Sequence, residues 1–122
     1  MDNFAKLWAD ANAAGREAAE ACTPTPMTIA RVDPITGRVL HVYEPITEGA
    51  CGFAYVTVKP GNSAFARWLK KQNLGHKAYY GGWEVSIFDY GQSYERKAAH
   101  ASAAARVLRD AGITATSRSV LD

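Results

Sequence analysis

The stretch at residues 51–59, CGFAYVTVK, decides how the second half of the chain folds. Its side chains alternate in character, as they do along a β-strand. Small and branched residues form one side: Ala54, Val56 and Val58. Phe53 and Tyr55 lie on the opposite side. A strand with two such different sides predicts a sheet that packs a core on one face only.

A short helix and a hairpin are predicted after this strand. Asn62 or Ser63 can cap the start of the helix, and Gly75 suits its end. Gly81-Gly82 then predicts a tight turn, because both positions accept positive φ. The two strands that flank this turn are expected at residues 77–80 and 83–89.

A longer helix follows, capped by Gln92 or Ser93 and ended by Gly112, and residues 113–117 suit a final strand. The order strand, helix, two hairpin strands, helix, strand is the split βαβ arrangement. We therefore predict an α+β fold with a ferredoxin-like βαββαβ sandwich over residues 51–118. Both helices would cover one face of its sheet. The N-terminal segments or a second subunit are alternatives for covering the other face.

The first half of the chain adds a helix and a hairpin to this unit. Residues 3–22 carry an apolar stripe at helical spacing, and Thr23-Pro24-Thr25-Pro26 ends the helix. Two β-branched runs, residues 27–32 and 38–43, then flank a turn at residues 33–37 and predict a hairpin. We predict one domain over residues 1–122, built from three parts: a helix and Pro-rich hinge (1–26), a hairpin and loop (27–50) and the ferredoxin-like core (51–122).

Charge is spread unevenly along the chain. The net charge is +2, but residues 49–83 contain five basic residues and no Asp or Glu. The five are Lys59, Arg67, Lys70, Lys71 and Lys77. Clustered Lys and Arg side chains are the donors that phosphate groups need. The segment therefore suggests an anionic partner, with a solvated helix face as the alternative.

Aromatic residues lie close to these cations in sequence. Tyr79, Tyr80 and Trp83 surround the Gly81-Gly82 turn. A second aromatic group would form on the uncovered sheet face if the strands are neighbours: Phe53, Tyr55 and Phe88. RNA-recognition modules stack bases on such rings. The alternative is that the rings are buried beneath another segment or subunit.

Motifs for catalysis or metal binding are not found in the sequence. It contains no P-loop, no G-x-G-x-x-G and no G-x-S-x-G, and the three histidines lack metal-ligand spacing. We expect no enzyme, no metal and no cofactor. Two catalytic alternatives stay open: Cys51 with His76 or His100 as base, and a carboxylate pair of Asp89 with Glu84 or Glu95.

The sequence also predicts a cytoplasmic protein with no membrane segment. No run approaches the roughly 18–20 apolar residues of a membrane span, and residues 1–8 lack a signal-peptide pattern. Two cysteines, Cys22 and Cys51, are too few for a disulfide framework. We expect both as thiols in a reducing compartment.

Several runs resemble a group of small accessory proteins encoded by tailed bacteriophages. The runs are residues 51–56 (CGFAYV), 59–71 (KPGNSAFARWLKK), 79–82 (YYGG), 92–97 (QSYERK), 21–27 and 111–122. The resemblance implies a source, the cytoplasm of an infected host cell, and no activity. Such proteins often bind host proteins, nucleic acids or nucleotide signals of host defence. Gln92 and Arg96 join the candidate site because they lie in a polar run of this kind.

These observations predict a non-enzymatic protein that holds a phosphate-bearing ligand, such as a host-defence nucleotide signal. The predicted ligand-binding residues are Lys59, Arg67, Lys70, Lys71, Lys77, Tyr79, Tyr80, Trp83, Gln92 and Arg96. One alternative is single-stranded nucleic-acid binding through the aromatic sheet face. Another is a protein–protein module, either a host-protein inhibitor or a virion part. Small-residue stripes on the first and last helices also suit a homo-oligomer.

Overall fold

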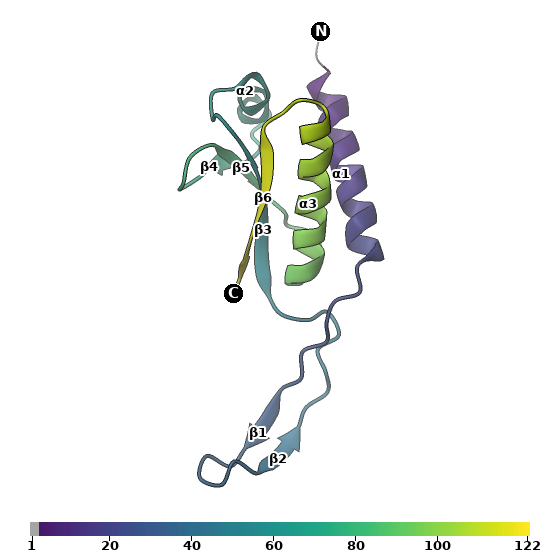
Figure 1. The fold of residues 1–122 in the computed structure, drawn as a ribbon, viewed down its shortest axis with the longest axis vertical. Coiled ribbons are helices and arrows are strands. Elements are labelled where there is room, and N and C mark those ends of the chain that lie inside the picture. Colours follow the sequence, from purple (N-terminus) through teal and green to yellow (C-terminus); the bar gives the residue numbers. More distant parts are fainter. Residues whose placement is uncertain (1–2) are drawn as a thin grey trace.

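Residues 3–122, which the computed structural model describes, form three helices and two antiparallel sheets (Figure 1). The mixed α+β class predicted from sequence is confirmed. The elements are α1 (Phe4–Ala21), β1 (Ala30–Val32), β2 (Val39–Val42), β3 (Gly52–Val58), α2 (Ala64–Lys71), β4 (His76–Lys77), β5 (Trp83–Ser86), α3 (Tyr94–Asp110) and β6 (Ala115–Leu121). Side-chain oxygens of Asn3, Ser63 and Ser93 cap the three helices.

The larger sheet has the strand order β4-β5-β3-β6, with every neighbouring pair antiparallel. Its centre is β3, which pairs with β6 along its whole length, from Gly52 opposite Leu121 to Val58 opposite Ala115. The predicted alternation is confirmed. Ala54, Val56 and Val58 are all buried against the core.

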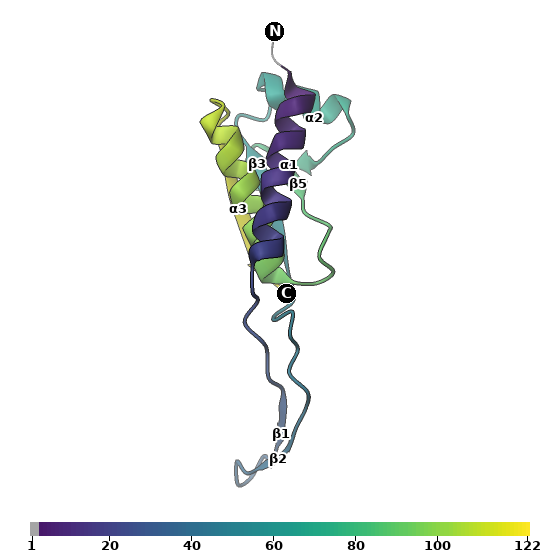
Figure 2. The same ribbon diagram turned by 90° about the vertical axis from the view of Figure 1, so that its right-hand side faces the viewer.

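The helical layer consists of α3, which covers one face of this sheet, and α1, which lies along α3 (Figures 1 and 2). The two helices approach closely at Gly15, where an added Cβ would lie 2.5 Å from His100 Cδ2. The small-residue stripes of α1 and α3 therefore pack on each other within one chain.

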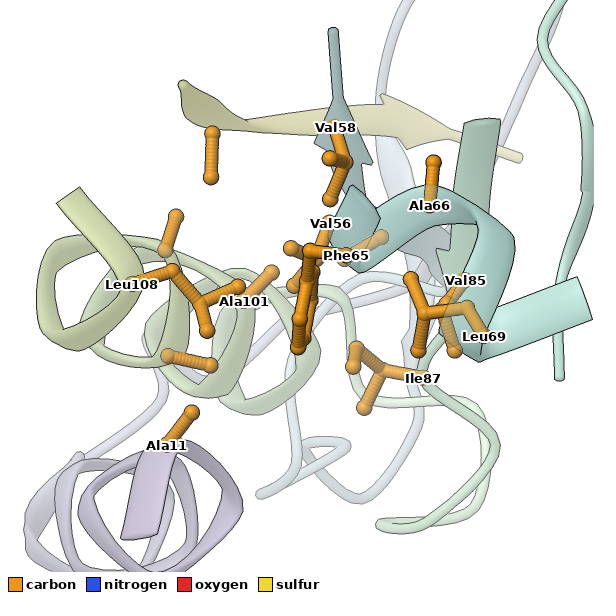
Figure 3. Close-up of a cluster of buried hydrophobic side chains, with 14 residues drawn as sticks. Ala11, Val56, Val58, Phe65, Ala66, Leu69, Val85, Ile87, Ala101 and Leu108 are labelled. Carbon is orange, nitrogen blue, oxygen red and sulfur yellow. The ribbon is translucent and has the colours of Figure 1, made fainter. Parts of the chain in front are cut away.

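The short helix α2 lies at one end of the sheet, which differs from the expected layer of α2 beside α3. Eight residues of helix extend only about 12 Å, whereas α1 is long enough to run beside α3. Phe65 of α2 nevertheless inserts into the centre of the core, between residues of α3 and of β5 (Figure 3). The Phe65 ring contacts the Phe4 ring of α1 edge-on, with 5.3 Å between ring centres, and stacks on the Trp68 ring, with 5.8 Å between ring centres.

Strands β1 and β2 form a hairpin that projects away from the rest of the molecule (Figures 1 and 2). We call residues 27–46 the arm and the remainder of the described chain the body. The predicted hairpin is confirmed, with shorter strands than expected. Its turn is held by Asp33 Oδ1, which accepts hydrogen bonds from the N–H groups of Ile35 (2.8 Å) and Thr36 (3.2 Å).

Predicted strand boundaries are wrong for β4, β5 and β6. The strand expected at 83–89 ends at Ser86, so Phe88 lies in the loop that follows β5. Residues 77–80 were expected as a strand, but β4 ends at Lys77 because the turn closes earlier: Ala78 N–H donates to Gly82 O at 3.0 Å. Tyr79 and Tyr80 therefore lie in the turn. The last strand was expected at 113–117, but β6 continues to Leu121 because β3 provides ladder partners down to Gly52.

Among residues 3–122, none of the helices combines the length and the apolar character that crossing a membrane requires.

Candidate functional site

The sheet face opposite α3 is uncovered in the described chain. Because α1 packs on α3 and the arm points away, neither N-terminal segment covers this face (Figures 1 and 2). Phe53 of β3 is 44% exposed and Tyr55 is half-buried. Phe88, in the loop that follows β5, is 86% exposed and lines a hollow with both rings. On β6, Arg118 stands opposite Tyr55, and its Cζ lies 4.3 Å from the centre of the Tyr55 ring. We call these four residues the open face.

A carboxylate lies beneath the open face and is neutralised there. Glu84 of β5 is only 3% exposed. Its carboxylate accepts hydrogen bonds from Arg118 Nη2 (2.9 Å) and Thr57 Oγ1 (3.3 Å), and His76 Nε2 lies 3.0 Å from it. Burial raises the pKa of Glu84, but Arg118 and His76 outweigh burial and hold the pKa below its usual range. The carboxylate therefore stays ionised and paired.

A small hollow adjoins this network at the turn between β4 and β5. Its volume is about 210 Å³, and its lining includes Lys59, Tyr79, Tyr80 and Arg118. We call it the turn hollow. Three of the predicted ligand-binding residues therefore meet here. Tyr79 and Tyr80 are almost fully exposed and their rings touch edge to face at 4.8 Å.

A second hollow lies where β5 diverges from β3, beyond the last hydrogen bond from Ile87 N–H to Ala54 O. Its volume is about 390 Å³. Its lining includes the open-face rings and two residues near the start of α3: Phe53, Tyr55, Phe88, Gln92 and Lys97. We call it the Lys97 hollow. Gln92 is the one predicted site residue that lies here.

The remaining predicted residues line neither of these two hollows. Lys70 donates to Gly61 O at 2.7 Å and lies 4.9 Å from the Trp83 ring. Trp83 is packed against the core and donates its indole N–H to Leu74 O. Arg67 and Lys71 are exposed on α2, and Lys77 is exposed on the edge strand β4. The structure thus distributes the basic run over several surfaces.

Arg96 lies at the base of the arm rather than near the open face. Its Nε donates to Glu48 Oε2 at 2.6 Å, and its Nη1 donates to Ala19 O at 2.6 Å. Ser93 Oγ also donates to Glu48 O, and Thr25 N–H donates to Glu95. These contacts attach the segments that flank the arm to the start of α3, and they occupy the polar groups of Ser93, Glu95 and Arg96.

Sequence reasoning did not select Lys97 or Arg118, and it considered Glu84 only as a catalytic carboxylate beside Asp89. Lys97 lay inside the polar run 92–97, but only the structure shows that it is buried beside aromatic rings. Arg118 was placed beyond the last strand. Extending that strand to Leu121 would have placed Arg118 on the same face as Tyr55.

The structure separates the groups of both catalytic alternatives. His76 is bonded to Glu84 at the far end of β3 from Cys51, about 20 Å away at the usual rise per residue. His100 lies between α1 and α3, bonded to Tyr90 and Asn12. Asp89 pairs with Arg16, apart from Glu84 and Glu95. Within residues 3–122, no three His, Cys, Asp or Glu side chains gather as a metal site.

Comparisons with protein-family models, with curated proteins and with solved structures find no match to this chain. The open face and its two hollows are therefore the features that point to a function.

Proposed function

We propose that the protein binds single-stranded nucleic acid by stacking bases on the open face. The observation that carries this proposal is the exposure of Phe53 on a sheet face beside Tyr55 and Arg118, with Phe88 exposed in the loop after β5 and lining the same hollow as Phe53 and Tyr55. Aromatic rings gathered on an uncovered surface mark a place where something binds. Bases stack on such rings regardless of their identity, because every base has a π-face.

The charges around the open face support a phosphate-bearing ligand. Lys59 presents a cation at the turn hollow, and Lys97 adds a second at the other hollow. The acidic Glu84 is already paired with Arg118 and His76, so it offers little repulsion to a phosphate. Rings flanked by cations are the combination that single-strand binding proteins use.

The strand order also supports this reading. In a ferredoxin-like unit the βαββαβ strands lie in the order second, third, first, fourth, which corresponds to β4-β5-β3-β6 here. We propose that residues 51–118 are a variant of that fold in which α1 replaces the first helix in the layer over the sheet. RNA-recognition modules of this kind bind through the face that their helices leave open.

A small phosphate-bearing ligand such as a nucleotide is the second candidate, because Lys59, Tyr79 and Tyr80 converge on the turn hollow. That hollow of about 210 Å³ is smaller than the ~300–1,000 Å³ of most small-molecule sites. At the turn hollow, where Tyr79 and Tyr80 lie, this size favours a strand laid across the face over one enclosed nucleotide. A counter-defence role in an infected cell stays a prediction of the sequence.

Fluorescence anisotropy with a labelled oligonucleotide of about 12 nucleotides tests the proposal. Wild type is expected to bind, more weakly as salt rises because bound phosphates release counterions. Phe53→Ala and Tyr55→Ala are each expected to weaken binding by about 1–3 kcal/mol. Tyr43→Ala, an exposed ring on the arm, is the matched control and should bind normally.

Two results would contradict the proposal: no binding by wild type at low salt, or full affinity in both sheet variants. Thermal-shift measurements with mono-, di- and cyclic nucleotides provide the second arm. A shift with one nucleotide that is lost in Lys59→Met, without oligonucleotide binding, would favour the second candidate instead.

A further inference from the structure

Lys97 is a buried cation at the edge of the open face. It belongs to the first turns of α3 and is only 5% exposed. Its Nζ lies 5.6 Å from the centre of the Phe53 ring and 3.3 Å from Gly52 O. The residue also lines the Lys97 hollow, so its side chain is enclosed by protein on most sides and bordered by a cavity.

The charge of Lys97 is not balanced by the described chain. No carboxylate among residues 3–122 forms an ion pair with it. An ammonium group has three N–H donors, and a single long hydrogen bond to Gly52 O uses one of them. Glu84, the other charged residue of this region that is nearly fully buried, has an arginine, a histidine and a hydroxyl around it.

The position of Lys97 in α3 makes its buried charge still less favourable. Lys97 lies close to the N-terminus of α3, where the helix dipole favours anions and disfavours cations. A buried charge without a partner is expensive, and proteins normally neutralise or pair it. An anion in the hollow would be favoured both by Lys97 and by the helix terminus, and it would remove both penalties.

We propose that the Lys97 hollow holds one phosphodiester of the bound strand, with its phosphate on Lys97 Nζ and the adjoining base against Phe53 or Phe88. The volume of about 390 Å³ lies within the range of small-molecule sites, so it admits one nucleotide unit. Gln92, in the same lining, offers amide donors and acceptors to that base. This inference rests on the proposed function and assigns one anchoring point within it.

Lys97→Met tests the assignment because methionine keeps the length of the side chain and removes the charge. The variant is expected to melt at a higher temperature than wild type in phosphate-free buffer, since an unpaired buried charge is removed. Inorganic phosphate should raise the melting temperature of wild type and not that of the variant. Lys71→Met, exposed on α2, is the matched control and should behave as wild type does.

The binding assay supplies the second readout. Lys97→Met is expected to weaken oligonucleotide binding about tenfold and to reduce the slope of log affinity against log salt by about one. Lys97→Arg should retain most of the affinity. Oligonucleotides with and without a 5′-phosphate are compared. Preference for the phosphorylated end that is lost in Lys97→Met would place a terminal phosphate in the hollow and overturn the internal phosphodiester.

Failure of this inference is distinguishable from failure of the proposed function. If wild type binds the oligonucleotide and Lys97→Met binds it equally with the same salt slope, the Lys97 hollow is not a phosphate site while the open face remains the interface. If wild type binds no oligonucleotide, the proposed function and the phosphodiester assignment both fail, whatever inorganic phosphate does to the melting temperature.

Discussion

The arm and the central pair β3–β5 are both antiparallel ladders with β-branched residues, yet they differ completely in burial. Every residue of β1 and β2 is exposed, whereas β3 alternates between core and open face. Both sides of the arm face solvent because no helix packs on it. A local pattern of residues is therefore sufficient to form a hairpin, but a second layer is required to make it part of a core.

This difference determines where the free energy of folding resides. The body buries apolar side chains from α1, α2, α3 and the sheet in one cluster (Figure 3). The arm has only its ladder, its Asp33 turn and the contacts at its base. An isolated two-stranded hairpin is at best marginally stable in water. We therefore expect the arm to open locally without unfolding the body.

The largest expected effect comes from a cavity in the body. Leu108 of α3 is fully buried in the cluster. Leu108→Ala removes its contacts and leaves a space that close-packed neighbours fill only in part, so the free energy of unfolding should fall by about 2–5 kcal/mol. Urea denaturation followed by circular dichroism measures this. A loss below about 1 kcal/mol would show that α3 is not packed on the sheet as described.

A change of pH is expected to have an intermediate effect on the free energy of unfolding, through a histidine in the body. Burial between the helices lowers the pKa of His100, and the nearby Arg16 cation lowers it further, while Asp89 opposes them. The neutral ring fits its contacts: Tyr90 OH lies 2.7 Å from Nδ1, and Asn12 Oδ1 lies 2.9 Å from Nε2. The folded state thus favours neutral His100.

The sign of the pH dependence follows from this lowered pKa. Above about pH 6.5, the ordinary histidine value, both states carry neutral His100 and its contribution is complete. Below that pH the unfolded state binds a proton that the folded state does not, so stability decreases as pH falls toward the folded pKa. His100→Gln should flatten this part of the profile, measured by urea denaturation. His41→Gln, on the arm, should leave it unchanged.

Local signals in the sequence predicted much of the body correctly. The alternation of β3, the Ser63 and Ser93 caps and the positive φ of Gly81 and Gly82 all depend on residues adjacent in the chain. The exposure of the open face was not predictable in this way. It depends on α1 packing against α3, which requires Gly15 and His100, far apart in sequence, to meet.

The candidate site was predictable to a smaller extent. Lys59 meets Tyr79 and Tyr80 at the turn hollow because β3 pairs with β5, with Val58 opposite Trp83. Arg96 does not join them, because its charge is used at the base of the arm. Lys97 is adjacent to Arg96 in sequence, yet it lines the Lys97 hollow. A polar run on a helix gives no information about which of its members a tertiary contact will bury.

The smallest expected effect is the counterpart of Leu108→Ala on the arm. Leu40 of β2 is about half exposed, and the substitution Leu40→Ala has the same chemistry as the one in α3. Because no cavity forms and little surface is buried there, the free energy of unfolding should change by no more than about 0.5 kcal/mol. Hydrogen exchange should show arm amides exchanging much faster than those of β3. A Leu40→Ala loss near that of Leu108→Ala, or slow exchange along β1 and β2, would mean that the arm is packed against something in solution.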